Sequence, residues 1–198
     1  MRATSVIAFR YNVICDLNAG RQEFLYNDIA VKVSSGEYAW PRQVIEAMKP
    51  VYPTDGQFKL AFVEKELKTT SGRNKKVVRH ILFRIERQLS EREFDEESAK
   101  YNLEHILPEH PSEEWGDIPE NIQEGLIYRL GNITLLESGL NRGIGNAGYA
   151  AKREAYRESD FQITRDLADT YDTWDEHKVE ARQKKLAAVA GSIWKIDF

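Results

Sequence analysis

The chain has 198 residues, of which 41% are hydrophobic and 30% charged, and its formal net charge is −4. This content suits one globular domain or two small ones, and four Trp, nine Tyr and eight Phe argue against disorder. One cysteine excludes a disulfide framework and a four-cysteine zinc site, and no apolar run approaches the roughly 20 residues of a membrane helix. We therefore expect a cytoplasmic protein without a membrane partner.

The first half of the chain is predicted to be helical after residues 1–20, whose pattern fits a helix and a strand equally. Apolar residues at helical spacing predict helices, which we place at 21–36, 41–49, 56–68 and 75–90. The last of these is amphipathic, and its apolar stripe is predicted to be core. Its other faces carry Arg79, Arg84 and Arg87, which we predict to contact DNA; a merely solvated basic face is the alternative.

The second half is predicted to contain shorter elements after a charged connector at 91–101. Two of them are strands, at 102–107 and 132–136, and the others are helices at 122–130, 147–158, 161–170 and 174–190. These patterns predict a mainly α, α+β fold with one small β-hairpin. We expect two parts, a helical region at 1–95 and a second domain at 96–198.

Charge is distributed unevenly around this boundary. Lys65–Arg92 holds nine basic and three acidic residues, a net +6, whereas Glu93–Glu124 holds one lysine and eleven acidic residues, a net −10. A local basic face can meet phosphates although the whole chain is acidic. The acidic block can attract a cation, and it repels DNA until that cation is bound.

Four polar residues form a pattern suited to cutting a phosphodiester bond. Glu104 and His105 end an apolar run before Pro108, and Asn132 and Asn141 follow, nine residues apart. A histidine with its ordinary pKa of about 6.5 can act as the base at neutral pH. Glu104 and Asn141 offer the oxygen ligands that Mg²⁺ prefers, and Asn132 can orient the histidine or hold its loop. Taken singly, these residues also suit a surface pair, a turn and a helix cap.

In combination, these residues resemble the motif of HNH endonucleases, which runs D/E-H-I-x-P, then N-L-x-x-L, then Asn or His nine residues after the first Asn. More narrowly, the chain is similar to the C-terminal nuclease domain of GmrSD-type restriction proteins and relatives such as SspE. The matching residues are Leu103–Glu109, Trp115, Arg129–Leu136, Asn141, Asn146, Tyr149, Lys152, Tyr156, Ser159, Trp174 and Arg182. The resemblance covers about 100–194 strongly and 20–90 with weaker motifs.

The resemblance implies a ββα-metal nuclease that cuts DNA with Mg²⁺, or with Mn²⁺ as the alternative. It assigns His105 as general base, Asn132 and Asn141 as further catalytic residues, and Glu104 and Asn141 as metal ligands. Asn146 is a secondary candidate, and Lys152 contacts a phosphate or else pairs on its helix. Many HNH enzymes also hold structural zinc between cysteine pairs, which this chain cannot do.

The resemblance also implies a setting and partners. Such proteins restrict foreign DNA that carries modified bases, or act in hosts with phosphorothioate-marked DNA. We therefore expect DNA as the substrate, and a nucleotide-hydrolysing sensor domain of the same full-length protein as a partner. Two alternatives remain open: a catalytically weak DNA-binding or regulatory module, and an RNA-directed HNH nuclease, since this chemistry does not itself select DNA.

Overall fold

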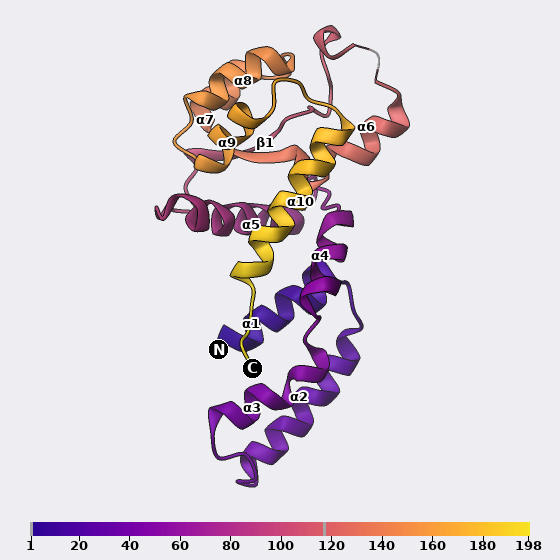
Figure 1. The fold of residues 1–198 in the computed structure, drawn as a ribbon, viewed down its shortest axis with the longest axis vertical. Coiled ribbons are helices and arrows are strands. Elements are labelled where there is room, and N and C mark those ends of the chain that lie inside the picture. Colours follow the sequence, from indigo (N-terminus) through magenta and orange to yellow (C-terminus); the bar gives the residue numbers. More distant parts are fainter. Residues whose placement is uncertain (1, 117) are drawn as a thin grey trace. The chain divides into compact units, whose positions relative to one another are not determined.

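The computed structural model describes residues 2–116 and 118–198, and helices dominate it (Figure 1). The α-helices are α1 (Arg2–Ala8), α2 (Ala19–Ser34), α3 (Pro41–Ala47), α4 (Asp55–Glu64), α5 (Gly72–Ser90), α6 (Glu120–Ile127), α7 (Ser138–Ile144), α8 (Tyr149–Arg157), α9 (Gln162–Thr170) and α10 (Glu176–Ile193). A π-helix, η1 (Phe9–Ile14), and three 3₁₀ turns, η2 (Lys49–Val51), η3 (Glu113–Trp115) and η4 (Leu130–Asn132), complete the helical elements. Strands β1 (Tyr101–His105) and β2 (Ile133–Glu137) form one antiparallel sheet, which confirms the predicted mainly α, α+β class.

The chain divides into two compact units. The first comprises the residues up to Phe62 together with Trp194–Phe198, and the second comprises Val63–Ile193. The sequence placed the division at 95/96 instead. The difference arises because α5 packs on β2, α9 and α10, so its amphipathic stripe belongs to the core of the second unit.

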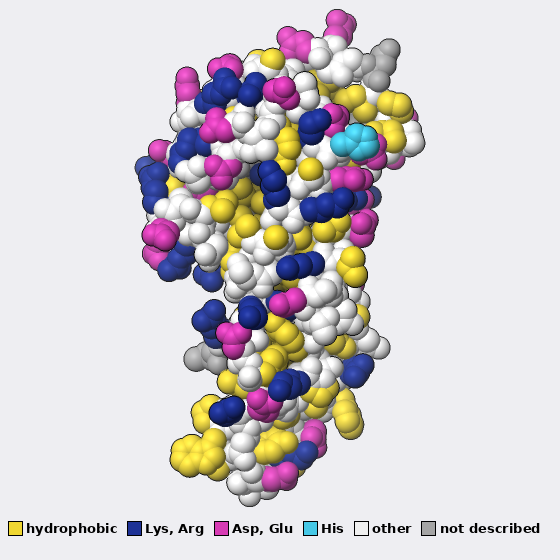
Figure 2. All heavy atoms as spheres, in the orientation of Figure 1, with side chains coloured by type: hydrophobic (Ala, Val, Ile, Leu, Met, Phe, Trp, Pro, Cys, Tyr) yellow, Lys and Arg dark blue, Asp and Glu magenta, His cyan; other side chains and the backbone are white. Residues whose placement is uncertain are grey.

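The first unit is organised around a buried arginine. Arg10 donates hydrogen bonds to the carbonyl oxygens of Pro53, at 2.9 Å, and Trp194, and it pairs with Asp55 at 2.7 Å. Several apolar side chains remain at the surface of this unit (Figure 2), including Phe24 and Trp40. The segment that the sequence left open, 1–20, is helical over most of its described length.

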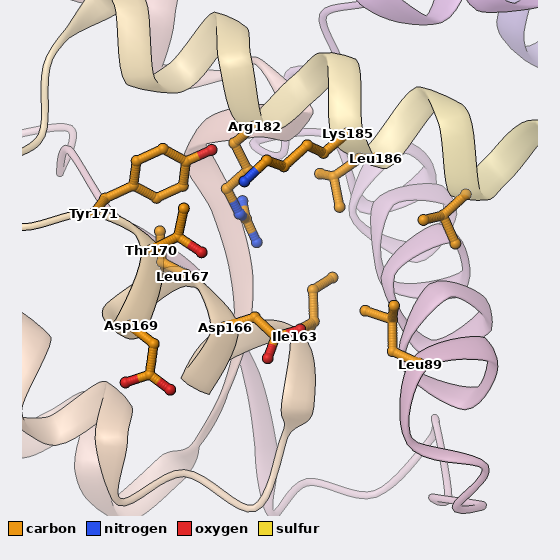
Figure 3. A pocket seen from close by; sticks show the side chains of 11 residues that line it. Leu89, Ile163, Asp166, Leu167, Asp169, Thr170, Tyr171, Arg182, Lys185 and Leu186 are labelled. Atoms are coloured by element: carbon orange, nitrogen blue, oxygen red, sulfur yellow. The ribbon is translucent and has the colours of Figure 1, made fainter.

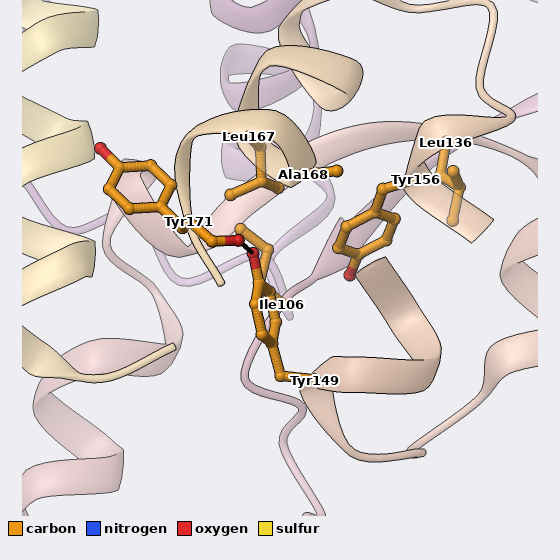
Figure 4. Close-up of a cluster of buried hydrophobic side chains, with 7 residues drawn as sticks. All are labelled: Ile106, Leu136, Tyr149, Tyr156, Leu167, Ala168 and Tyr171. Carbon is orange, nitrogen blue, oxygen red and sulfur yellow. Dashed lines mark hydrogen bonds between the residues drawn. The ribbon is translucent and has the colours of Figure 1, made fainter. Parts of the chain in front are cut away.

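The second unit is built on the hairpin of β1 and β2. His105 lies opposite Ile133 and Tyr101 opposite Glu137 in the strand register. Residues 133–136 of β2 are all buried, because α5 and α9 contact this strand. Beside it lies a cluster of buried side chains from β1's end, β2, α8 and α9 (Figure 4), formed by Ile106, Leu136, Tyr149, Tyr156, Leu167, Ala168 and Tyr171.

Helix α10 fixes the turn that precedes β2. Gln183 accepts a hydrogen bond from the amide of Gly131 at 2.9 Å and donates to the carbonyl oxygens of Val63 and Lys65. A Cβ on Gly131 would lie 2.2 Å from the carbonyl oxygen of Val179, so only glycine allows this close approach. Within the described residues, no helix is both long and apolar enough to cross a lipid bilayer.

Candidate active site

His105 is the last residue of β1, and its ring is largely enclosed. Its Nε2 lies 3.1 Å from the hydroxyl oxygen of Thr69, and its ring meets that of Tyr128 edge-on, with the centroids 6.0 Å apart. Burial lowers the pKa of His105 below its ordinary value, and the carboxylate of Glu109 partly opposes this shift. A lowered pKa keeps the imidazole neutral near pH 7, which is the form that can accept a proton.

Glu104 points to the other face of the strand, where its carboxylate is almost fully buried at 6% exposure. Oε1 accepts hydrogen bonds from Lys152 Nζ at 2.6 Å and from the Tyr156 hydroxyl at 2.9 Å. Oε2 accepts one from Asn141 Nδ2 at 3.0 Å. Because burial destabilises the ionised carboxyl group, it raises the pKa of Glu104, and Lys152 is the largest influence in the opposite direction.

The position of Lys152 does not fit the predicted contact with a phosphate, because its side chain is 0% exposed. Its ammonium donates to Glu104 and also to the carbonyl oxygen of His105, at 2.8 Å. Burial lowers the pKa of Lys152, and the adjacent Glu104 opposes that shift. Lys152 therefore attaches α8 to the strand end that carries the histidine, which corresponds to the pairing alternative.

Asn132 lies in the turn before β2 and is fully buried, and the hydrogen bonds of its side chain to described residues go to Leu107, Ile127 and Trp174 rather than to the histidine ring. Its Oδ1 accepts hydrogen bonds from the amide of Leu107 and from Trp174 Nε1, at 2.9 and 3.0 Å. Its Nδ2 donates to the carbonyl oxygen of Leu107 at 2.9 Å. Of the two predicted actions, this geometry favours holding the loop after His105 over orienting its ring.

Asn141 lies inside α7 rather than at its start, and it reaches back to β1. The described residues include no group of three or more His, Cys, Asp and Glu side chains arranged to hold a metal. Glu104 Oε2 accepts one hydrogen bond and Asn141 Oδ1 accepts none from the described residues, so both keep a lone pair. Two such oxygens fit Mg²⁺, which retains several waters. Asn146 lies in the exposed turn after α7, away from these contacts.

Strand β1 thus carries a histidine with a lowered pKa and, on its opposite face, a buried carboxylate that accepts a hydrogen bond from the Asn141 amide of α7. The family model for the C-terminal domain of GmrSD restriction endonucleases matches residues 52–189. The chain belongs to this family. No curated protein matches the chain significantly.

Membership in the GmrSD C-terminal family assigns the chain to the restriction-endonuclease type of nuclease, for which DNA is the substrate. The matched segment contains Glu104, His105, Asn132 and Asn141. It also contains α4 and α5, which lie outside the predicted second domain at 96–198.

The three arginines predicted to contact DNA differ in their surroundings. Arg79 departs from the prediction, because its guanidinium donates to the carbonyl oxygens of Glu96, Ser98 and Tyr101 and so holds the chain that leads into β1. Arg84 and Arg87 are exposed on α5, and Arg87 pairs with Glu93 at 2.6 Å. For these two, contact with DNA stays a prediction.

Two residues at the site were not assigned roles from the sequence. Tyr156 follows Lys152 by one helical turn, and this i, i+4 spacing was a usable signal that both face the same partner. Thr69 lies in a polar turn 36 residues before His105, and no pattern connects the two. Only the folded structure places its hydroxyl beside the imidazole.

Proposed function

We propose that this GmrSD-family domain is a metal-dependent HNH-type endonuclease that hydrolyses phosphodiester bonds of DNA. The observation that carries the proposal is the end of β1, where His105 has a lowered pKa and Glu104, on the opposite face of the strand, accepts a hydrogen bond from Asn141 of α7. This combination supplies a base and an oxygen donor pair on one rigid ββα unit.

In this proposal, His105 accepts a proton from the water that attacks phosphorus. We assign to His105 the tautomer in which Nε2 donates its hydrogen to the Thr69 hydroxyl, 3.1 Å away, because this leaves Nδ1 to accept the proton. Asn132 holds the main chain at Leu107, so the imidazole is carried by a fixed strand end. Glu104 and Asn141 would hold one Mg²⁺ or Mn²⁺, which supplies charge stabilisation at the phosphate and the leaving oxygen.

The biological setting we propose is restriction of foreign DNA in the cytoplasm. DNA recognition would then be shared with a nucleotide-hydrolysing sensor domain of the full-length protein, and recognition of modified bases or of phosphorothioate would be a property of that domain. One site on one chain makes one nick at a time. A double-strand cut therefore needs a second event or a second chain.

The test is cleavage of supercoiled plasmid by the 198-residue chain with Mg²⁺ or Mn²⁺. We expect conversion to nicked plasmid with either metal and none with EDTA. Binding of plasmid without any cut under both metals would overturn the proposal and favour a DNA-binding module. Cleavage of RNA with intact plasmid would favour an RNA-directed nuclease.

Thr69 provides a prediction about pH dependence. Because the pKa of His105 is lowered, the cleavage rate should rise with pH and reach half of its plateau value at a pH below 6.5. We call this rise the limb of the pH profile. The Thr69→Val variant should lower the plateau rate about 2–10-fold, the effect of one neutral hydrogen bond. Because the same bond is stronger to the imidazolium, its loss should also move the limb to still lower pH. Thr69→Ser, which keeps the hydroxyl, should restore both the plateau rate and the midpoint pH of the limb.

Single-turnover cleavage rates measured across pH decide this point. If Thr69→Val lowers the plateau rate but leaves the midpoint pH of the limb unchanged, Thr69 contributes through packing alone. An unchanged profile for Thr69→Val would remove the residue from the site.

A further inference from the structure

A pocket lies in the unit formed by Val63–Ile193, between the end of α5 and helices α9 and α10 (Figure 3). Its cavity is about 300 Å³ in volume, at the small end of the range of ligand pockets. Most of its wall is apolar and comes from Leu89, Ile163, Leu167, Leu186 and Val189. None of the residues around His105 described above lines it, so it is a separate feature.

One buried cation at this pocket, Arg182, forms no ion pair with an acidic side chain among residues 2–116 and 118–198. Arg182 is 4% exposed, and its Nη1 donates to the carbonyl oxygens of Gly131 and Ile133, at 2.8 Å each. Its Nη2 makes no hydrogen bond within the described part of the chain. Its hydrogen-bond partners are main-chain oxygens, and burial lowers its pKa to about 10. A buried charge normally requires a paired charge of opposite sign, and here a bound anion would supply it.

A second donor at the pocket also lacks an acceptor. Tyr171 is 7% exposed, and within residues 2–116 and 118–198 its hydroxyl has no hydrogen-bond partner. Figure 3 shows its phenol, the guanidinium of Arg182 and the exposed Lys185 along the same side of the pocket, with the ammonium of Lys185 5.2 Å from the phenol ring. Buried polar groups are nearly always paired, so two unpaired donors in one place indicate a missing acceptor.

Acidic side chains restrict where the anion can lie. Asp166 and Asp169 line the pocket on α9, and Asp166 already accepts a hydrogen bond from Gln162 at 2.5 Å. Asp169 is exposed. A ligand that carried negative charge at both ends would meet one of these carboxylates, whereas a ligand with one negative group and an apolar body would not.

We propose that this pocket binds a small monocarboxylate with an apolar body. Its carboxylate accepts hydrogen bonds from Arg182 Nη2 and from the Tyr171 hydroxyl, and its body lies against the leucine and isoleucine side chains. Both donor atoms are buried, so the ligand must displace neighbouring side chains to reach them. A carboxylate matches these donors because it offers two acceptor oxygens and the missing charge together.

Isothermal titration of the chain with benzoate and hexanoate tests the proposal, with benzamide and hexanamide as neutral counterparts. We expect saturable binding of a carboxylate, and about 10–100-fold weaker binding of its amide, as loss of a hydrogen bond to a charged group implies. Tyr171→Phe should weaken carboxylate binding about 2–10-fold. Val189→Trp, which fills the pocket, should abolish it, whereas Val31→Trp on an exposed site of α2 should bind like the parent.

Circular dichroism of each variant shows whether it is folded, and Leu89→Trp replaces Val189→Trp if the latter unfolds. The absence of saturable binding by both carboxylates would overturn the proposal. Equal affinity for acid and amide, or undiminished binding by the folded pocket-filling variant, would overturn it as well. None of these readouts depends on nuclease activity.

Discussion

Replacing His105 with alanine is expected to reduce plasmid nicking about 10²–10⁴-fold, the usual contribution of a general base. The lowered pKa of His105 leaves its imidazole able to take a proton from water near pH 7, whereas the neighbouring Glu104 is held by Lys152 and Tyr156. The measurement is the single-turnover rate at saturating Mg²⁺. Added imidazole should restore part of the rate, because the substitution leaves a space of that shape.

His177→Ala is the matched control, since this histidine is exposed at the start of α10. Its rate should equal that of the parent. If His105→Ala cut DNA as fast as His177→Ala, the assignment of His105 as the base would fail. An unfolded His105→Ala variant would be recognised by circular dichroism, and His105→Gln would then take its place.

Replacing Lys152 with methionine is expected to lower the free energy of unfolding by about 3–5 kcal/mol. Methionine fills a similar volume but leaves the buried carboxylate of Glu104 without its cation, and it also removes the donor to the carbonyl oxygen of His105. Chemical denaturation followed by circular dichroism measures the change.

Two further variants isolate the charge effect. The double variant with Lys152→Met and Glu104→Gln should recover part of the loss, because no unpaired charge remains buried. Lys178→Met breaks the exposed pair with Asp175, at 3.0 Å, and should cost less than about 1 kcal/mol. A loss for Lys152→Met no larger than that of Lys178→Met would show that the buried pair does not stabilise the fold.

The sequence was sufficient to predict the hairpin because its signals are local. Short apolar segments with β-branched residues predicted two strands, and the structure places them at Tyr101–His105 and Ile133–Glu137, within a residue or two of the predicted bounds. The nine residues from Asn132 to Asn141 likewise span one strand, β2, and the first four residues of α7. The sequence pattern therefore predicted those features of the site that depend on residues close together along the chain.

Contacts between distant segments were not predictable in the same way. Arg79 and Lys152 were interpreted as phosphate contacts because a basic residue on an amphipathic helix looks the same whether it meets solvent or main-chain oxygens. Their burial depends on which segment packs against that helix, and periodicity carries no information about it. The predicted boundary between the two units differs from the observed one for the same reason. The sequence showed that α5 is amphipathic, but not which elements it packs against.

The contacts of α10 with the turn before β2 have a consequence for synthesis of the protein. Gln183 and Arg182 provide the partners for the main chain of residues 130–133, including the amide of Gly131. On the ribosome, β1, β2 and α7 emerge well before this helix does, and until then these main-chain groups have only water as a partner. We therefore expect the loop that Asn132 holds to become ordered only after residues 176–193 have been synthesised.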